Sequence, residues 1–167
     1  MDTLILVSGA WRSAYVLIRW LRTHPGRIHA LCCRAFAGHD QATFAAIPVL
    51  RACIEGMFPG RVQWHDAAIT RTWEDHDGGA DNLAYLVGRF LACPVGSGIK
   101  TILTGRKIGV GGKRVTEVSP ETPANDAVIE IPPSVIKVLD LCQNGVLHCG
   151  KCPQCQEIET AYNQIRG

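Results

Sequence analysis

Short apolar runs alternate with longer segments of helical periodicity through the first hundred residues of this chain. Four apolar runs have the length of strands and cover residues 3–8, 28–33, 62–69 and 100–103. Apolar residues recur near helical spacing over 11–23, 40–55 and 82–93. Strands that alternate with helices predict an α/β fold, in which a doubly wound parallel sheet forms the middle of three layers.

The second half of the chain is less regular. Residues 105–126 are rich in glycine, proline and basic residues, which predicts a long loop. Residues 127–131 are expected to form an edge strand or extended segment, Pro132 and Pro133 to open a short helix reaching Leu141, and residues 154–166 to form a last helix. A hydrophobic content of 47% in 167 residues is enough for one core, so we expect residues 1–167 to form a single domain.

Hydropathy and charge restrict where the protein acts and what it binds. No apolar stretch reaches the roughly 20 residues that span a bilayer, and no basic segment precedes an apolar core at the start. We therefore expect a soluble, cytoplasmic protein with no membrane partner. The formal net charge is only +2, and lysine and arginine are spread along the chain, so nucleic acid is not the expected partner.

Four of the eight cysteines are clustered: Cys142, Cys149, Cys152 and Cys155 have the spacing C-x6-C-x2-C-x2-C. Tight C-x-x-C turns bring two thiolates to one ion, and four thiolates complete the tetrahedral shell of a structural zinc. Such a site has no open position, so the 142–155 knuckle is expected to hold the chain in place and do no chemistry. The alternatives are an iron–sulfur cluster, two disulfides or four reduced thiols, and His148 is a neighbour that can replace one cysteine.

The first apolar run ends in a turn that suits phosphate. Ser8, Gly9 and Ala10 place backbone N–H groups before a helix, Ser8 and Ser13 add hydroxyls, and Arg12 adds a positive charge. The plainer alternative is an ordinary turn after a buried strand, with Arg12 solvated on the first helical turn.

Three segments together carry a family resemblance. "LILVSGAWRSAYVLIRWL" resembles the first strand, loop and helix of the PP-loop ATP pyrophosphatases, whose loop pattern is Ser-Gly-Gly-x-Asp-Ser. "LCQNGVLHCGKCPQCQEIETAYN" resembles the zinc-binding end of one branch of that superfamily, the 7-cyano-7-deazaguanine synthases. A middle segment of the same family is similar to "DNLAYLVGRFLACPVGSGIKTILTG", where Asn82, Thr104 and Gly105 match residues of the family pattern.

The resemblance implies a PP-loop, adenine nucleotide alpha hydrolase-like fold and a reaction. In that family ATP adenylates the carboxylate of a 7-deazaguanine, pyrophosphate leaves, and ammonia converts the acid through an amide to a nitrile. Residues 8–13 would then hold the ATP phosphates together with Mg²⁺. The substrate would contact Asn82, Thr104 and Gly105, and the zinc would be structural. The implied partners are a nucleotide, a small deazapurine and a second copy of the chain in a homodimer.

The chain also departs from the family pattern. Ala10 stands in place of the second glycine, Arg12 in place of the acid, and Asp81 in place of the arginine before Asn82. The methyl group of Ala10 narrows the approach to phosphate, and a cation at position 12 repels Mg²⁺ where a carboxylate would bind it.

Two functions therefore stay open. One is a divergent, ATP-dependent C–N ligase of deazapurine biosynthesis that takes charge from a basic loop, namely Arg106, Lys107, Lys113 and Arg114. The other is a catalytically inactive PP-loop relative, a zinc-stabilised subunit for nucleotide binding or scaffolding. A zinc-knuckle nucleic-acid binder is a third, more remote reading.

Overall fold

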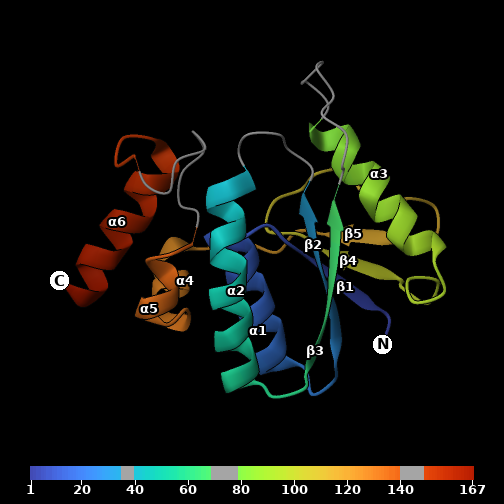
Figure 1. Cartoon of the computed structure of the whole chain (residues 1–167). Coiled ribbons are helices and arrows are strands. Elements are labelled where there is room, and N and C mark those ends of the chain that lie inside the picture. The colour runs from blue at the N-terminus through green and yellow to red at the C-terminus, as the bar shows by residue number, and fades with distance from the viewer. Residues whose placement is uncertain (35–39, 69–78, 140–148) are drawn as a thin grey trace.

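Figure 1 shows the computed structural model, which describes residues 1–34, 40–68, 79–139 and 149–167. These residues form a five-stranded sheet in which all neighbouring strands are parallel. The strands are β1 (Thr3–Val7), β2 (Ile28–Arg34), β3 (Val62–Ala68), β4 (Thr101–Leu103) and β5 (Thr116–Val118). Their order across the sheet is β3-β2-β1-β4-β5, so the winding direction changes between β1 and β4.

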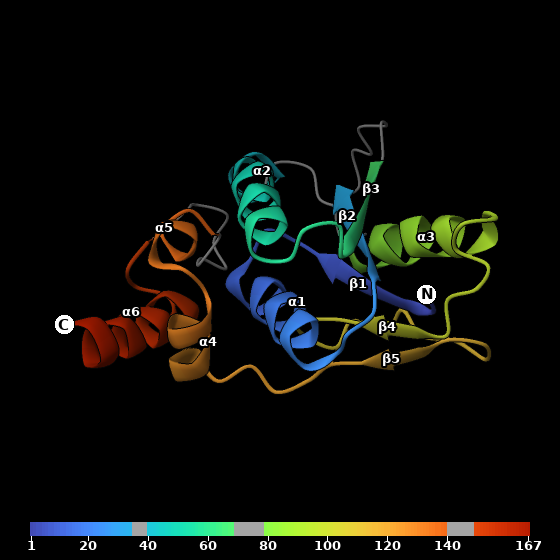
Figure 2. The same cartoon turned by 90° about the horizontal axis from the view of Figure 1, so that it is seen from below.

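Helices cover both faces of this sheet, as Figure 2 shows. They are α1 (Trp11–Thr23), α2 (Asp40–Met57) and α3 (Gly79–Ala92). Ile5 and Val7 pack with α1 and α2 on one face, whereas Leu4 and Leu6 pack with α3 on the other. Successive strand residues point to opposite faces, so β1 is buried on both sides, which explains its unbroken apolar sequence. The parallel α/β sheet predicted from the sequence is confirmed.

Three more helices lie beyond α1 and α2, on the side away from the sheet (Figure 1). They are α4 (Ala124–Glu130), α5 (Pro133–Ile136) and α6 (Pro153–Arg166). Helix α4 packs on both α1 and α6, and α5 packs on α2. Eight of the thirteen α1 residues are buried, among them Trp11, Leu17 and Ile18. Helix α1 is therefore covered on two sides, by the sheet and by the C-terminal helices.

The prediction of an extended segment at residues 127–131 is wrong, because α4 covers 124–130. Its β-branched residues favour a strand when taken one by one. In the structure Ala127, Val128 and Ile131 are buried in the core shared with α1 and α6, while Ile129 is 60% exposed. Burial at positions i, i+1 and i+4 is the pattern of a helix face, and this packing outweighs the local strand preference.

Three other boundaries differ from the sequence prediction. The expected loop at 105–126 contains β5, whose Thr116 N–H donates to the carbonyl of Lys100 beside β4. The helix opened by Pro132 and Pro133 is only the short α5, and residues 140 and 141 lie outside the described residues. Helix α3 begins at Gly79, so Asn82 lies inside its first turn and does not cap it.

Glu130 ties α4 to α1. Its side chain is buried, and it accepts a hydrogen bond of 2.7 Å from the Arg19 guanidinium. Arg22 NH1 lies 3.3 Å from the other carboxylate oxygen. A carboxylate at the C-terminal end of a helix is unfavourable with the helix dipole, and these two cations on α1 offset that cost.

Glu130→Gln is expected to lower the free energy of unfolding by about 1–2 kcal/mol, because the charge-assisted contacts are lost but both arginines are partly solvated. Urea denaturation measures the change. The matched control is Glu159→Gln on the exposed side of α6, which should change stability by less than about 0.5 kcal/mol. Equal effects of the two substitutions would contradict the role given to Glu130.

His29 on β2 and His65 on β3 form a pair beneath α3. The His29 Nδ1 and His65 Nε2 atoms are 2.9 Å apart, and both rings contact Phe90 of α3. Burial lowers the pKa of His29, and the neighbouring His65, the N-terminal amine and Arg27 lower it further. Burial also lowers the pKa of His65, although the nearby Asp66 opposes this. The folded protein therefore favours the neutral pair.

Because the folded-state pKa values are below the unfolded value of about 6.5, the unfolded chain binds more protons as the pH falls. The free energy of unfolding should therefore decrease between pH 7 and pH 5. His65→Gln should flatten this decrease, because it removes one of the two histidines whose pKa is lowered in the folded protein. Urea denaturation at several pH values checks this, and an unchanged pH dependence in His65→Gln would rule it out.

Candidate metal centre and phosphate-binding turn

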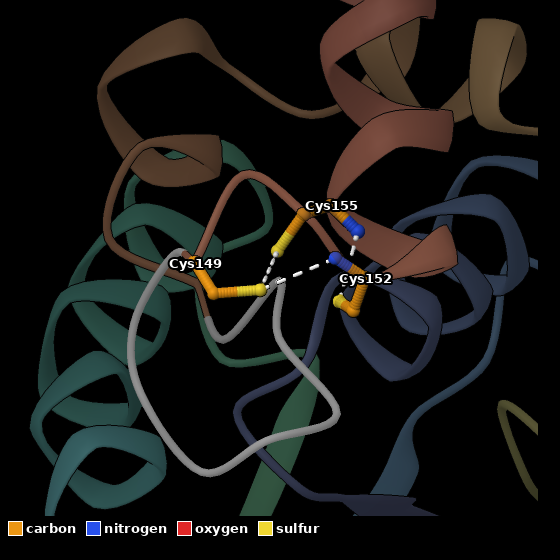
Figure 3. A group of neighbouring side chains, drawn as sticks. All are labelled: Cys149, Cys152 and Cys155. Atoms are coloured by element: carbon orange, nitrogen blue, oxygen red, sulfur yellow. Dashed lines mark hydrogen bonds between the residues drawn. The ribbon is translucent and has the colours of Figure 1, made fainter.

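Three of the four clustered cysteines lie together at the start of α6 (Figure 3). The sulfur atoms of Cys149, Cys152 and Cys155 all lie within 4.8 Å of one another. Cys142, the fourth predicted ligand, and His148 lie outside the described residues. The structure therefore brings together a cysteine triad that can hold a metal ion.

Backbone hydrogen bonds shape this triad. The N–H groups of Lys151 and Cys152 donate to Cys149 Sγ at 3.4 and 3.2 Å, and the Cys155 N–H donates to Cys152 Sγ at 3.5 Å. Cys152 is the N-cap of α6, and Pro153 occupies the first helical position, where its missing N–H costs nothing. The start of the helix thus fixes two of the three sulfur atoms.

The donor set fits zinc. A tetrahedral shell with Zn–S bonds of about 2.3 Å places two sulfur atoms about 3.8 Å apart. Cys149 Sγ and Cys155 Sγ are 3.9 Å apart, which is far longer than a disulfide bond of about 2.05 Å. Burial raises the pKa of the Cys155 thiol to about 12, so its thiolate needs a cation beside it. Three thiolates at this spacing are consistent with structural zinc, with Cys142 as the expected fourth ligand.

Polar groups of the predicted phosphate-binding turn form hydrogen bonds with one another. Gly9 has φ +79°, a conformation that residues with a side chain rarely adopt, and it lets β1 turn sharply into α1. The Ser8 N–H donates to Ser13 Oγ at 3.2 Å, the Ala10 N–H donates to Ser8 Oγ at 3.3 Å, and the Ser13 hydroxyl donates to the Ala10 carbonyl at 3.0 Å. Two backbone donors of the turn are therefore already paired within it.

Arg12 is also bound within the chain. Its guanidinium donates to Thr122 Oγ1 at 2.6 Å and to the Glu157 carboxylate of α6 at 2.9 Å. The guanidinium carbon also lies 4.3 Å from the centre of the Trp11 ring. The Arg12 side chain is 28% exposed and that of Glu157 is 42% exposed, so water reaches the ion pair. Arg12 thus links the start of α1 to the segment before α4 and to α6.

The residues expected to meet the substrate lie partly beside this turn. A Cβ atom on Gly105 would lie 2.8 Å from Ser13 N and 2.9 Å from Arg12 Cβ, so the end of β4 directly contacts the first turn of α1. Thr104 is buried, and its hydroxyl donates to Glu117 at 3.1 Å. The side chain of Asn82 lies outside the described residues.

Sequence reasoning missed three residues that organise this region: Glu117, Thr122 and Glu157. The Glu117 carboxylate accepts hydrogen bonds from Ile108 N–H and Val110 N–H at 2.7 and 2.9 Å. Burial opposes its ionisation, but these hydrogen bonds and that of Thr104 prevail and hold the pKa of Glu117 below its usual value. The β-branched run Val115, Thr116 and Val118 was the available signal for the strand that carries Glu117.

No family model matches this chain, and no curated protein is significantly similar to it. The PP-loop resemblance thus rests on its own three segments. In the described part of the chain, no helix has the length and apolar composition needed to cross a membrane.

Cys152→Ser is expected to abolish stoichiometric zinc binding and to lower Tm by about 5–10 °C, because a metal that binds the folded state stabilises it. Metal analysis by mass spectrometry and thermal denaturation measure the two effects. Cys93→Ser is the matched control, because the Cys93 thiol donates to the Phe90 carbonyl and a hydroxyl can do the same. One zinc per chain retained in Cys152→Ser would contradict the assignment.

Proposed function

We propose that this chain is a zinc-stabilised binding or scaffolding protein of the PP-loop type that does not turn over ATP. The observation that carries the proposal is the pairing of Arg12 with Glu157 and Thr122. At this position the family resemblance expects an acid that helps to hold Mg²⁺. Here the position carries a cation, which repels Mg²⁺, and its hydrogen bonds join α1 to the C-terminal helices.

The hydrogen bonds of the turn support the same conclusion. A phosphate site at a helix N-terminus depends on backbone N–H groups that are open to the ligand. The N–H groups of Ser8 and Ala10 are paired with hydroxyls of the turn, and Gly105 lies against Ser13 N. These two N–H groups are therefore already used within the protein.

The metal centre supports a structural role. A zinc bound by four thiolates would have no position for a substrate or an activated water. Its ligands begin α6, and α6 holds Glu157 in place for Arg12. Zinc at this site would therefore stabilise the contact that occupies Arg12.

A second function, the adenylation and amidation of a 7-deazaguanine carboxylate, is favoured by one observation. The first turn of α1 and Gly105 after β4 meet where the winding direction of the sheet changes. Ligands of open α/β sheets bind at this point, at the carboxyl ends of the strands.

Pyrophosphate release separates the two functions. The zinc-loaded protein is incubated with ATP, Mg²⁺, ammonia and 7-carboxy-7-deazaguanine, and pyrophosphate is measured with and without the carboxylate. We expect no carboxylate-dependent release and no Mg²⁺-dependent rise in Tm with ATP. Release that requires the carboxylate would overturn the proposal and establish the ligase.

A repair of the turn tests the role of Arg12 directly. Ala10→Gly combined with Arg12→Asp should give a rise in Tm with ATP that depends on Mg²⁺, because the carboxylate supplies a metal ligand. The matched control combines Ala10→Gly with Arg12→Asn, which also breaks the Glu157 pair but adds no charge. Equal responses of the two variants would mean that the charge at position 12 does not decide nucleotide binding.

A further inference from the structure

The loop between β4 and β5 concentrates positive charge that the proposed function leaves unused. It contains two exposed basic pairs, Arg106 with Lys107 and Lys113 with Arg114, and no acidic residue lies between 104 and 116. Because the whole chain has a net charge of only +2, all other residues together carry −2. Four of the 17 basic residues of the chain therefore lie within nine positions of this loop, and Glu117 is the first acidic residue after them.

The loop has a defined conformation. The Glu117 carboxylate binds the N–H groups of Ile108 and Val110 and the hydroxyl of Thr104, and so fastens the middle of the loop to β5. Gly112 and Val115 exchange two backbone hydrogen bonds, of 2.9 and 3.4 Å, across a tight turn. Lys113 and Arg114 form the tip of that turn.

The apolar and the basic side chains of the loop differ in their exposure to solvent. Ile108, Val110 and Val115 are partly buried and pack against the core on the α3 side of the sheet. All four basic side chains are exposed, and in the described ranges none of them pairs with a carboxylate. The loop thus presents cations to solvent while its apolar residues turn inward.

We propose that this loop binds the phosphate backbone of a nucleic acid. Lysine and arginine that neutralise phosphates release condensed counterions, and this supplies most of the affinity of sequence-independent binding. Four exposed cations on one loop fit an extended polyanion, whereas a small phosphate compound needs an enclosed site. Insertion into a membrane is disfavoured, because inserting segments expose apolar anchors and the apolar residues of this loop pack inward.

The binding proposal is independent of the proposed function, since it uses neither the Ser8–Ser13 turn nor ATP. The binding proposal also predicts how steeply the affinity falls with salt concentration, which the composition of the chain does not give. If each of the four cations neutralises one phosphate, log K should fall with log salt with a slope of about −3 to −4, according to strand number.

Fluorescence anisotropy of the zinc-loaded protein with a labelled 20-nucleotide RNA, as single strand and as duplex, measures this slope between 25 and 200 mM KCl. Replacing Arg106, Lys107, Lys113 and Arg114 by glutamine should weaken binding at 50 mM KCl at least about tenfold and bring the slope close to zero. The control replaces four other exposed cations by glutamine, which gives the same net charge, namely Arg27, Arg89, Lys137 and Arg166. It should retain most of the affinity and the slope.

Circular dichroism and Tm confirm that both quadruple variants fold. Equal losses in the loop variant and the control would overturn the proposal, since net charge alone would then explain binding. So would an absence of binding by the parent protein at 25 mM KCl. Binding to phosphatidylserine vesicles that depends on the loop, without RNA binding, would assign the surface to membranes instead.

Discussion

Helix α1 packs between two layers, and both of its contacts are largely apolar. Its buried side chains pack with the sheet on one side and with α4 on the other, and α6 packs in turn on α4. A polar group that loses water in such a contact costs free energy unless a group of the protein binds it. Arg12, Arg19 and Arg22 are the polar groups at the edge of this contact, and each is bound by a residue of the C-terminal segment.

The same contact connects the two ends of the described chain. The cysteine triad begins α6, α6 places Glu157 opposite Arg12, and Arg12 lies in the first turn after the Ser8–Ala10 turn. A change at the metal centre is therefore expected to reach the turn through one ion pair and the apolar contact beneath it. A metal ion at the triad would therefore stabilise the Ser8–Ala10 turn as well as the start of α6.

Much of the fold could be predicted because strong local patterns agree with the packing. The apolar run of β1 reflects burial on both faces, and the spacing of the cysteines predicted a four-cysteine site, three of whose members the structure brings together. Helix α4 could not be predicted, because its strand-like residues become helical only against α1 and α6. The Arg12 pair joins residues 145 positions apart, and no local pattern reveals such a partner. The PP-loop assignment and its chemistry stay predictions.

Hydrogen exchange with and without zinc tests the link between the metal centre and the turn most directly. After zinc is removed with a chelator, the amides of α6 and of residues 8–13 should exchange faster, while β1 and β2 stay protected. In Glu157→Gln the response of residues 8–13 should be much smaller, because the link through Arg12 is lost. Faster exchange confined to residues 149–155 would contradict the account.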